Sequence, residues 1–180
     1  MALKGPLLAF TLAIAAGAGA FMRDGGPAGA APDPAWREVK WPFLLDQWGT
    51  GRAFQCPAAE CGVALNLYVR PKIGFCNCAT GVADDAELDR VGDVELVDAH
   101  FAPRGDGHPI TVGRMNGRSR LYAAQAGPAV LALAFNQQCD VVVATVAGDG
   151  DLPPDAERVA MTLLNSERVL HWVQASLGLS

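Results

Sequence analysis

The sequence predicts an α+β domain: an antiparallel β-sheet in a meander, with helices packed on one face and a C-terminal helix that closes the domain. Two observations predict this class. Four strand patterns separated by turn residues follow one another between residues 108 and 147, and helical patterns follow over residues 156–165 and 166–178. Strands in series with helices at one end are typical of an α+β fold.

The N-terminal segment resembles a secretory signal. A cation precedes an uncharged apolar run that ends in Ala18-Gly19-Ala20, so we expect a signal peptide over residues 1–20 that is cleaved after Ala20. The alternative is a membrane anchor over residues 5–22. Residues 21–35 are rich in Gly, Ala and Pro, and we expect them to form a spacer. A single domain over residues 36–180 would then lie in the periplasm or be secreted.

The first half of this domain contains short strand patterns and one short helix. The segment ADDAELDRVG predicts a helix that is capped by Asp84 or Asp85 and ends at Gly92. The expected strands of this half cover residues 37–43, 51–56, 64–70 and 93–98.

The second half predicts four consecutive strands and two helices. Asn116-Gly117 is a strong hairpin signal, because both central positions of a type I′ turn need positive φ. The apolar run from Val141 to Val146 lacks alternation, which indicates a central strand that is covered on both faces. In the last helix we expect Ser166 as the N-cap and Gly178 as the left-handed stop. The four strands are expected over residues 108–115, 118–124, 130–136 and 139–147.

The order of these elements carries a family resemblance. Trp41-Pro42-Phe43 stands at the entry to the domain, strands fill the segment between Ile110 and Ala147, and a helix ends at Leu177. In this order the chain resembles the PsbP-like class of domains over most of residues 36–179. The resemblance implies an extrinsic, non-enzymatic accessory domain. The cysteines of this chain are no part of the pattern of that class.

Five cysteines offer the clearest chemical signal. Four of them form the pattern C-x4-C-x14-C-x-C, and an exported protein meets an oxidising environment that favours disulfides. A bond between cysteines one residue apart is strained, so we expect Cys56 and Cys61 to pair with Cys76 and Cys78, although a Cys56–Cys61 loop is an alternative. Cys139 is then the expected free thiol, buried and inert. Alternatively, it forms a disulfide with one of these four cysteines or with a cysteine of another chain.

Two other interpretations of the same cysteines stay open. Four thiolates from Cys56, Cys61, Cys76 and Cys78 could hold a metal, with copper ahead of zinc because soft ligands in C-x-C suit Cu(I). A reactive thiol–disulfide pair is the second alternative, although the chain has no C-x-x-C. The disulfide interpretation predicts no cofactor.

Polar side chains gather in two further places. Asp98, His100, Asp106 and His108 lie in one expected loop, which is either solvated or a mixed nitrogen and oxygen metal site. Acidic residues are dense between positions 84 and 98, and three arginines at positions 114, 118 and 120 lie near the hairpin. These charges are either solvated or a docking surface for a partner of opposite sign.

The net charge and the absence of several catalytic motifs limit the classes of function that we expect. The full chain has a net charge of −5, and loss of residues 1–20 removes Lys4 alone, which leaves 13 − 19 = −6. Such an acidic chain has no electrostatic reason to bind nucleic acid or an anionic membrane. The sequence has no G-x-S-x-G, H-E-x-x-H or phosphate-binding glycine loop, although triad members can be far apart. We expect an accessory or binding domain, not an enzyme, whose partner is a protein or small ligand in the cell envelope.

Overall fold

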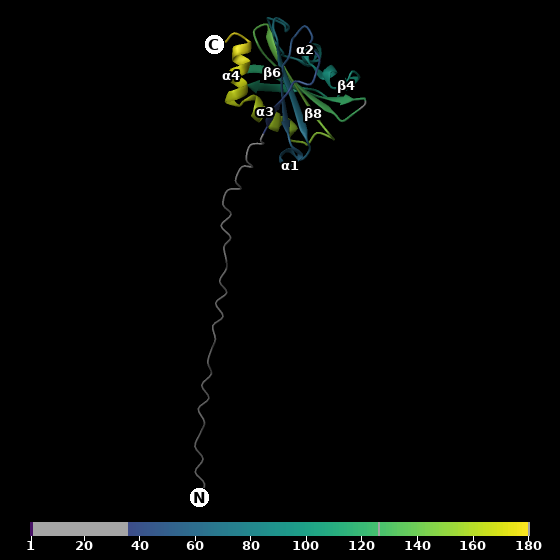
Figure 1. Cartoon of the computed structure of the whole chain (residues 1–180), viewed down its shortest axis with the longest axis vertical. Helices are drawn as coiled ribbons and strands as arrows, with labels where there is room; N and C mark the ends of the chain where they lie inside the picture. The colour runs from purple at the N-terminus through teal and green to yellow at the C-terminus, as the bar shows by residue number, and fades with distance from the viewer. Residues whose placement is uncertain (2–35, 126, 180) are drawn as a thin grey trace. The chain divides into compact units, whose positions relative to one another are not determined.

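The structure is a computed structural model that describes Met1 and residues 36–125 and 127–179 (Figure 1). The expected signal peptide and spacer and the alternative anchor therefore lie, apart from Met1, outside the described residues. Within the described part of the chain, no helix is long and apolar enough to cross a membrane.

One antiparallel sheet of eight strands forms the centre of the fold, and the expected α+β class is confirmed. Its order is β1-β2-β3-β8-β7-β6-β4, and β5 pairs with β6 as well. Strands β5 to β8 form the expected meander, and β8 lies in the middle of the sheet between β3 and β7, as its apolar run predicts. The strands are β1 (Arg37–Val39), β2 (Arg52–Cys56), β3 (Leu65–Lys72), β4 (Phe101–Pro103), β5 (His108–Val112), β6 (Met115–Ala124), β7 (Val130–Gln137) and β8 (Asp140–Gly148).

The helices begin and end close to the expected residues. The Asp84 side chain accepts a hydrogen bond of 2.8 Å from the Glu87 amide at the start of α2, and Gly92 follows its end. Ser166 precedes the last helix, but its hydroxyl donates to the Leu163 carbonyl and does not cap the helix amides. The helices are α1 (Ala58–Cys61), α2 (Asp85–Val91), α3 (Ala156–Leu164) and α4 (Glu167–Ser176), with a 3₁₀ turn η1 (Val94–Leu96).

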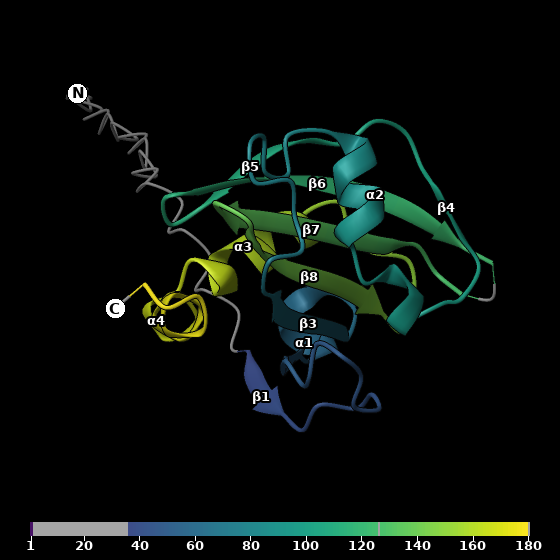
Figure 2. The same ribbon diagram turned by 90° about the horizontal axis from the view of Figure 1, so that it is seen from above.

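Helices cover both faces of the sheet, so the expectation that they pack on one face is wrong for α2. Figure 2 shows α2 in front of β6 and β7, and α3 behind the sheet. Leu131, Leu133 and Phe135 of β7 pack in the cluster that includes α3 and α4, whereas Ala132 and Ala134 pack in the cluster that includes α2. Because β7 and β8 are apolar on both faces, each face needs a cover.

The first hairpin turns three residues earlier than expected. Val112 pairs with Met115, so the two turn residues are Gly113 and Arg114, and Gly113 has a φ of 59°. A glycine in the first central position suits a type II′ turn. Gly117 lies inside β6, where a Cβ would come within 2.0 Å of the Ala134 carbonyl oxygen. This glycine is needed for the close approach of β7, not for a turn.

The segment 93–98, expected to be a strand, contains η1 instead. Asp93 is buried there, and its carboxylate receives Arg70 Nε at 2.6 Å and Arg70 Nη2 at 2.9 Å. Lys72 Nζ lies 2.6 Å from the same carboxylate. Asp93 therefore ties the end of α2 to β3 through a buried group of three charges. The chain turns directly after Asp93, in η1, and does not continue as an extended strand.

The arginines of β6 pair with the acidic residues of α2. Asp85 binds Arg118 by a short hydrogen bond, and Asp89 binds Arg120 at 3.0 Å and Tyr122 Oη at 2.5 Å. The Arg118 hydrogen bond lowers the pKa of Asp85, and burial raises the pKa of Tyr122, with Asp89 adding to the rise. These charges are satisfied within the chain, so the expected docking surface is in large part an internal contact that holds α2 on the sheet.

Candidate functional site

The cysteines pair differently from the main expectation. Cys56 bonds Cys61, and Cys78 bonds Cys139, which leaves Cys76 as the free and buried cysteine. The expected pairing across β3 and the expected free Cys139 are therefore wrong, while the Cys56–Cys61 alternative is right. Cys61 belongs to α1, one tight turn after the end of β2, which brings its Cα to 6.1 Å from that of Cys56. Cys139 lies in the β7–β8 turn, not in the strand, and that turn faces the loop of Cys78.

This pairing separates the ligands of the metal alternative. Two of the four proposed sulfurs bond each other, a third is bonded to Cys139, and the fourth is the Cys76 thiol. The described residues contain no group of three or more His, Cys, Asp or Glu side chains placed to hold a metal ion. Burial raises the pKa of the Cys76 thiol, and the charges of Glu87 and Asp140 raise it further.

The four polar residues of the expected loop do not come together as one site. Asp98 accepts a hydrogen bond of 2.8 Å from the His100 amide, a local contact at the start of β4. Asp106 and His108 instead line a cavity, and neither Asp98 nor His100 is among its lining residues. This cavity combines apolar and charged side chains, which is the composition usual for a small-ligand site.

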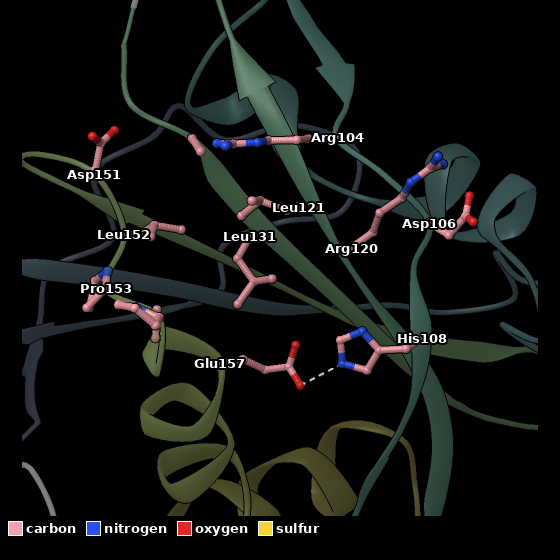
Figure 3. A pocket seen from close by; sticks show the side chains of 13 residues that line it. Arg104, Asp106, His108, Arg120, Leu121, Leu131, Asp151, Leu152, Pro153 and Glu157 are labelled. Carbon is pink, nitrogen blue, oxygen red and sulfur yellow. Dashed lines mark hydrogen bonds and ion pairs between the residues drawn. The ribbon is translucent and has the colours of Figure 1, made fainter.

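The cavity lies between the β-meander and the start of α3, and its volume is about 450 Å³ (Figure 3). Leu121, Leu131 and Leu152 lie in its middle and provide an apolar floor. These leucines come from β6, β7 and the β8–α3 connection, so the floor exists only in the folded sheet. Charged and polar side chains surround it and come from the β4–β5 loop, β5, β6, the β8–α3 connection and α3.

At one wall of the cavity, the lining residues His108 and Glu157 form a hydrogen-bonded row with Ser119, which lies behind the wall. Glu157, in the first turn of α3, accepts a hydrogen bond of 2.7 Å from the buried Ser119 hydroxyl. Its other carboxylate oxygen lies 2.9 Å from His108 Nε2 (Figure 3). Ser119 thus bonds the glutamate and not the histidine, and its hydroxyl is fully buried, so it does not face the cavity as a nucleophile would. The row fixes the Glu157 carboxylate at the edge of the cavity.

The opposite rim carries charges without partners. Arg104 is exposed and lies across the leucine floor from the His108–Glu157 pair (Figure 3). Within residues 36–125 and 127–179, neither the Arg104 guanidinium nor the Asp151 carboxylate has a hydrogen bond or ion pair. Arg120 also borders the cavity, but its guanidinium is turned to Asp89 and to the Gly105 carbonyl. Asp106, which is exposed and also lines the cavity, has no such partner within the described residues either, so the charges free to meet a ligand are those of Arg104, Asp106 and Asp151.

Sequence reasoning found only part of this site. Asp106 and His108 were expected in a polar loop, but Arg104 and Glu157 gave no separate signal. Searches against protein-family models, curated proteins and solved structures find no match to this chain. The resemblance to the PsbP-like class remains an expectation from the element order.

Proposed function

We propose that this chain is an exported, disulfide-stabilised binding domain, without catalytic activity, that holds a small zwitterion with an apolar body. The observation that carries the proposal is the cavity, in which an apolar floor lies between the unpaired cation of Arg104 and the carboxylate of Glu157 (Figure 3). Two disulfides support export, because such bonds persist in oxidising compartments.

The chemistry of the lining selects this class of ligand. An apolar body would bury the three leucines of the floor, and the Arg104 guanidinium can hold a carboxylate by two parallel hydrogen bonds. An ammonium group would be placed at the Glu157 carboxylate, across the leucine floor from Arg104 (Figure 3). A volume of about 450 Å³ is within the usual range for small-ligand sites and suits an apolar amino acid or a short peptide.

The arrangement of polar groups favours binding over catalysis. Ser119 is fully buried and donates to Glu157, so its hydroxyl is neither accessible nor activated by His108. A general base must reach the proton that it removes, and a nucleophile needs such a base beside it. The row supports a role in fixing the Glu157 carboxylate for a cationic group.

Calorimetric titration and thermal unfolding of protein produced from the full chain test this proposal. Leucine is the first probe, and isoamylamine and 4-methylpentanoate are matched probes that each lack one charged group. We expect leucine to bind more tightly and to raise the unfolding temperature more than either matched probe. Recovery of unaltered leucine after long incubation is expected, and a chemically altered product would contradict the non-enzymatic assignment.

Arg104→Ala is the decisive variant. Loss of a hydrogen-bonded charge pair costs about 1.5–3 kcal/mol, so the affinity for leucine should fall by about tenfold or more. Arg114→Ala is the matched control, since Arg114 is exposed, lies in the β5–β6 turn and is not among the cavity residues. The proposal is wrong if leucine does not bind at millimolar concentrations, or if both variants bind it equally well.

A further inference from the structure

Three of the five cysteines meet at one corner of the fold, away from the cavity. Cys78 and Cys139 form a disulfide with their Cα atoms 4.2 Å apart. The Cys76 amide donates a hydrogen bond of 3.0 Å to the Cys139 carbonyl. The Cys76 thiol lies 3.2 Å from the carbonyl oxygen of Gln138, the residue before Cys139.

Cys139 thus has a second cysteine beside it, next to the one to which it is bonded. The hydrogen bond of 3.0 Å between the Cys76 nitrogen and the Cys139 carbonyl oxygen limits the separation of the two Cα atoms to about 7 Å, because each Cα lies only one or two covalent bonds from the bonded atom. Disulfides form over Cα separations of about 4.4–6.8 Å. The position of Cys76 therefore suits a bond to Cys139 without a large movement of the backbone.

The loop that carries Cys76 is held beside the β7–β8 turn by more than the disulfide. The Gly74 amide donates to the Asp140 carboxylate at 2.7 Å, and the Val82 amide donates to the Asn136 side chain at 2.9 Å. These bonds flank Cys76 on both sides along the chain. They would keep Cys76 next to Cys139 after the bond to Cys78 is broken.

We infer that Cys76, Cys78 and Cys139 form a thiol–disulfide exchange site, in which Cys139 alternates between two partners. Cys76 loses its proton, and its thiolate attacks the Cys139 sulfur. The Cys76–Cys139 bond forms as the Cys78–Cys139 bond breaks, and Cys78 leaves with the bonding electron pair and takes up a proton. The number of disulfides and thiols does not change, so no oxidant or reductant is required.

The exchange moves the free thiol from the interior to the surface. Cys76 is 6% exposed, whereas Cys78 lies in the exposed part of the loop. A thiol at Cys78 can form a mixed disulfide with a small thiol compound or with a cysteine of another protein, which the buried Cys76 cannot do. The site is independent of the ligand proposed for the cavity.

The surroundings of Cys76 make the exchange slow near neutral pH. Burial, Glu87 and Asp140 raise the pKa of its thiol, and Arg90 opposes them. The attacking species is the thiolate, so the rate should increase as the pH rises toward the pKa of Cys76.

Alkylation of the native, oxidised protein with N-ethylmaleimide tests the inference. We expect the label to appear on Cys78, in molecules that contain a Cys76–Cys139 bond by peptide mapping, at a rate that increases with pH. Cys76→Ser should abolish the labelling of Cys78. Labelling of Cys76 itself, no labelling at high pH, or equal labelling of Cys78 in Cys76→Ser would overturn the inference.

A second variant tests the geometry directly. After oxidation with glutathione disulfide, Cys78→Ser should contain no free thiol among its four cysteines and no bound glutathione by intact mass, because Cys76 pairs with Cys139. Cys56→Ser, which also has four cysteines, is the matched control and should contain two free thiols, on Cys61 and Cys76. Two free thiols in Cys78→Ser would contradict the proposed Cys76–Cys139 bond. The alkylation experiment on the unsubstituted chain tests the exchange even if Cys78→Ser does not fold.

Discussion

The two faces of the sheet use charged residues in opposite ways. Under α2, the described cations of β3 and β6 are paired with carboxylates from α2 and the turn after it. Under α3, Arg104 and Asp151 stand unpaired around an apolar hollow. The pairs of the α2 face are Asp85 with Arg118, Asp89 with Arg120, and Asp93 with Arg70 and Lys72.

This difference separates charges that hold the fold together from charges available to a ligand. A buried ion that is paired and hydrogen-bonded contributes to a single arrangement of the chain, and it becomes costly when its partner is lost. A charge that has no partner beside a hollow contributes little to stability and can meet a ligand at small cost. Substitutions on the α2 face should therefore change stability, and those around the cavity should change binding.

The largest expected effect is that of Asp93→Asn. This change leaves the Arg70 and Lys72 side chains, only 3% and 4% exposed, without their shared carboxylate. Loss of one partner from a buried ion pair costs about 3–5 kcal/mol. The free energy of unfolding, measured in urea, should fall by that amount. Asp106→Asn, at the exposed rim of the cavity, is the control and should change the free energy of unfolding by less than about 0.5 kcal/mol. An equally small change for Asp93→Asn would contradict the stabilising role assigned to the charges of the α2 face.

The two disulfides should differ in their contribution to stability. The Cys78–Cys139 bond spans 61 residues of sequence on the α2 side, and the Cys56–Cys61 bond spans 5. The chain-entropy estimate is about 4 kcal/mol for the first and about 2 kcal/mol for the second. Replacing both cysteines of each pair by serine and measuring urea unfolding should give this order. The reverse order would show that loop length does not control the effect here.

The smallest expected effect is the pH dependence that Asp85 contributes. Arg118 lowers the pKa of Asp85 in the folded chain below its unfolded value of about 3.9. The stabilisation is therefore present above about pH 4 and is lost as the pH falls through the folded pKa. The stability difference between the unsubstituted chain and Asp85→Asn should shrink on acidification, as followed by urea unfolding at several pH values. A difference that grows with acid would contradict the pairing with Arg118.

The sequence by itself determined the features that depend on neighbours along the chain. The run from Val141 to Val146 indicated a strand covered on both faces, and β8 is central. The α2 cap was readable because Asp84 bonds an amide only three residues away. Strand and helix order, and with them the α+β class, follow from such local patterns, since apolar periodicity and capping act within a few residues.

Only the tertiary structure decided which distant residues meet. At position 117 only a glycine allows β6 to approach β7 so closely, because a Cβ would overlap the Ala134 carbonyl oxygen. No pattern of neighbouring residues in the sequence predicts this contact. Cys139 bonds Cys78 because the β7–β8 turn comes beside a loop 61 residues earlier in the chain. The cavity likewise joins Arg104 and Glu157 from separate elements. Each of these depends on contacts formed when the sheet and its helices pack, so sequence spacing alone could not place them.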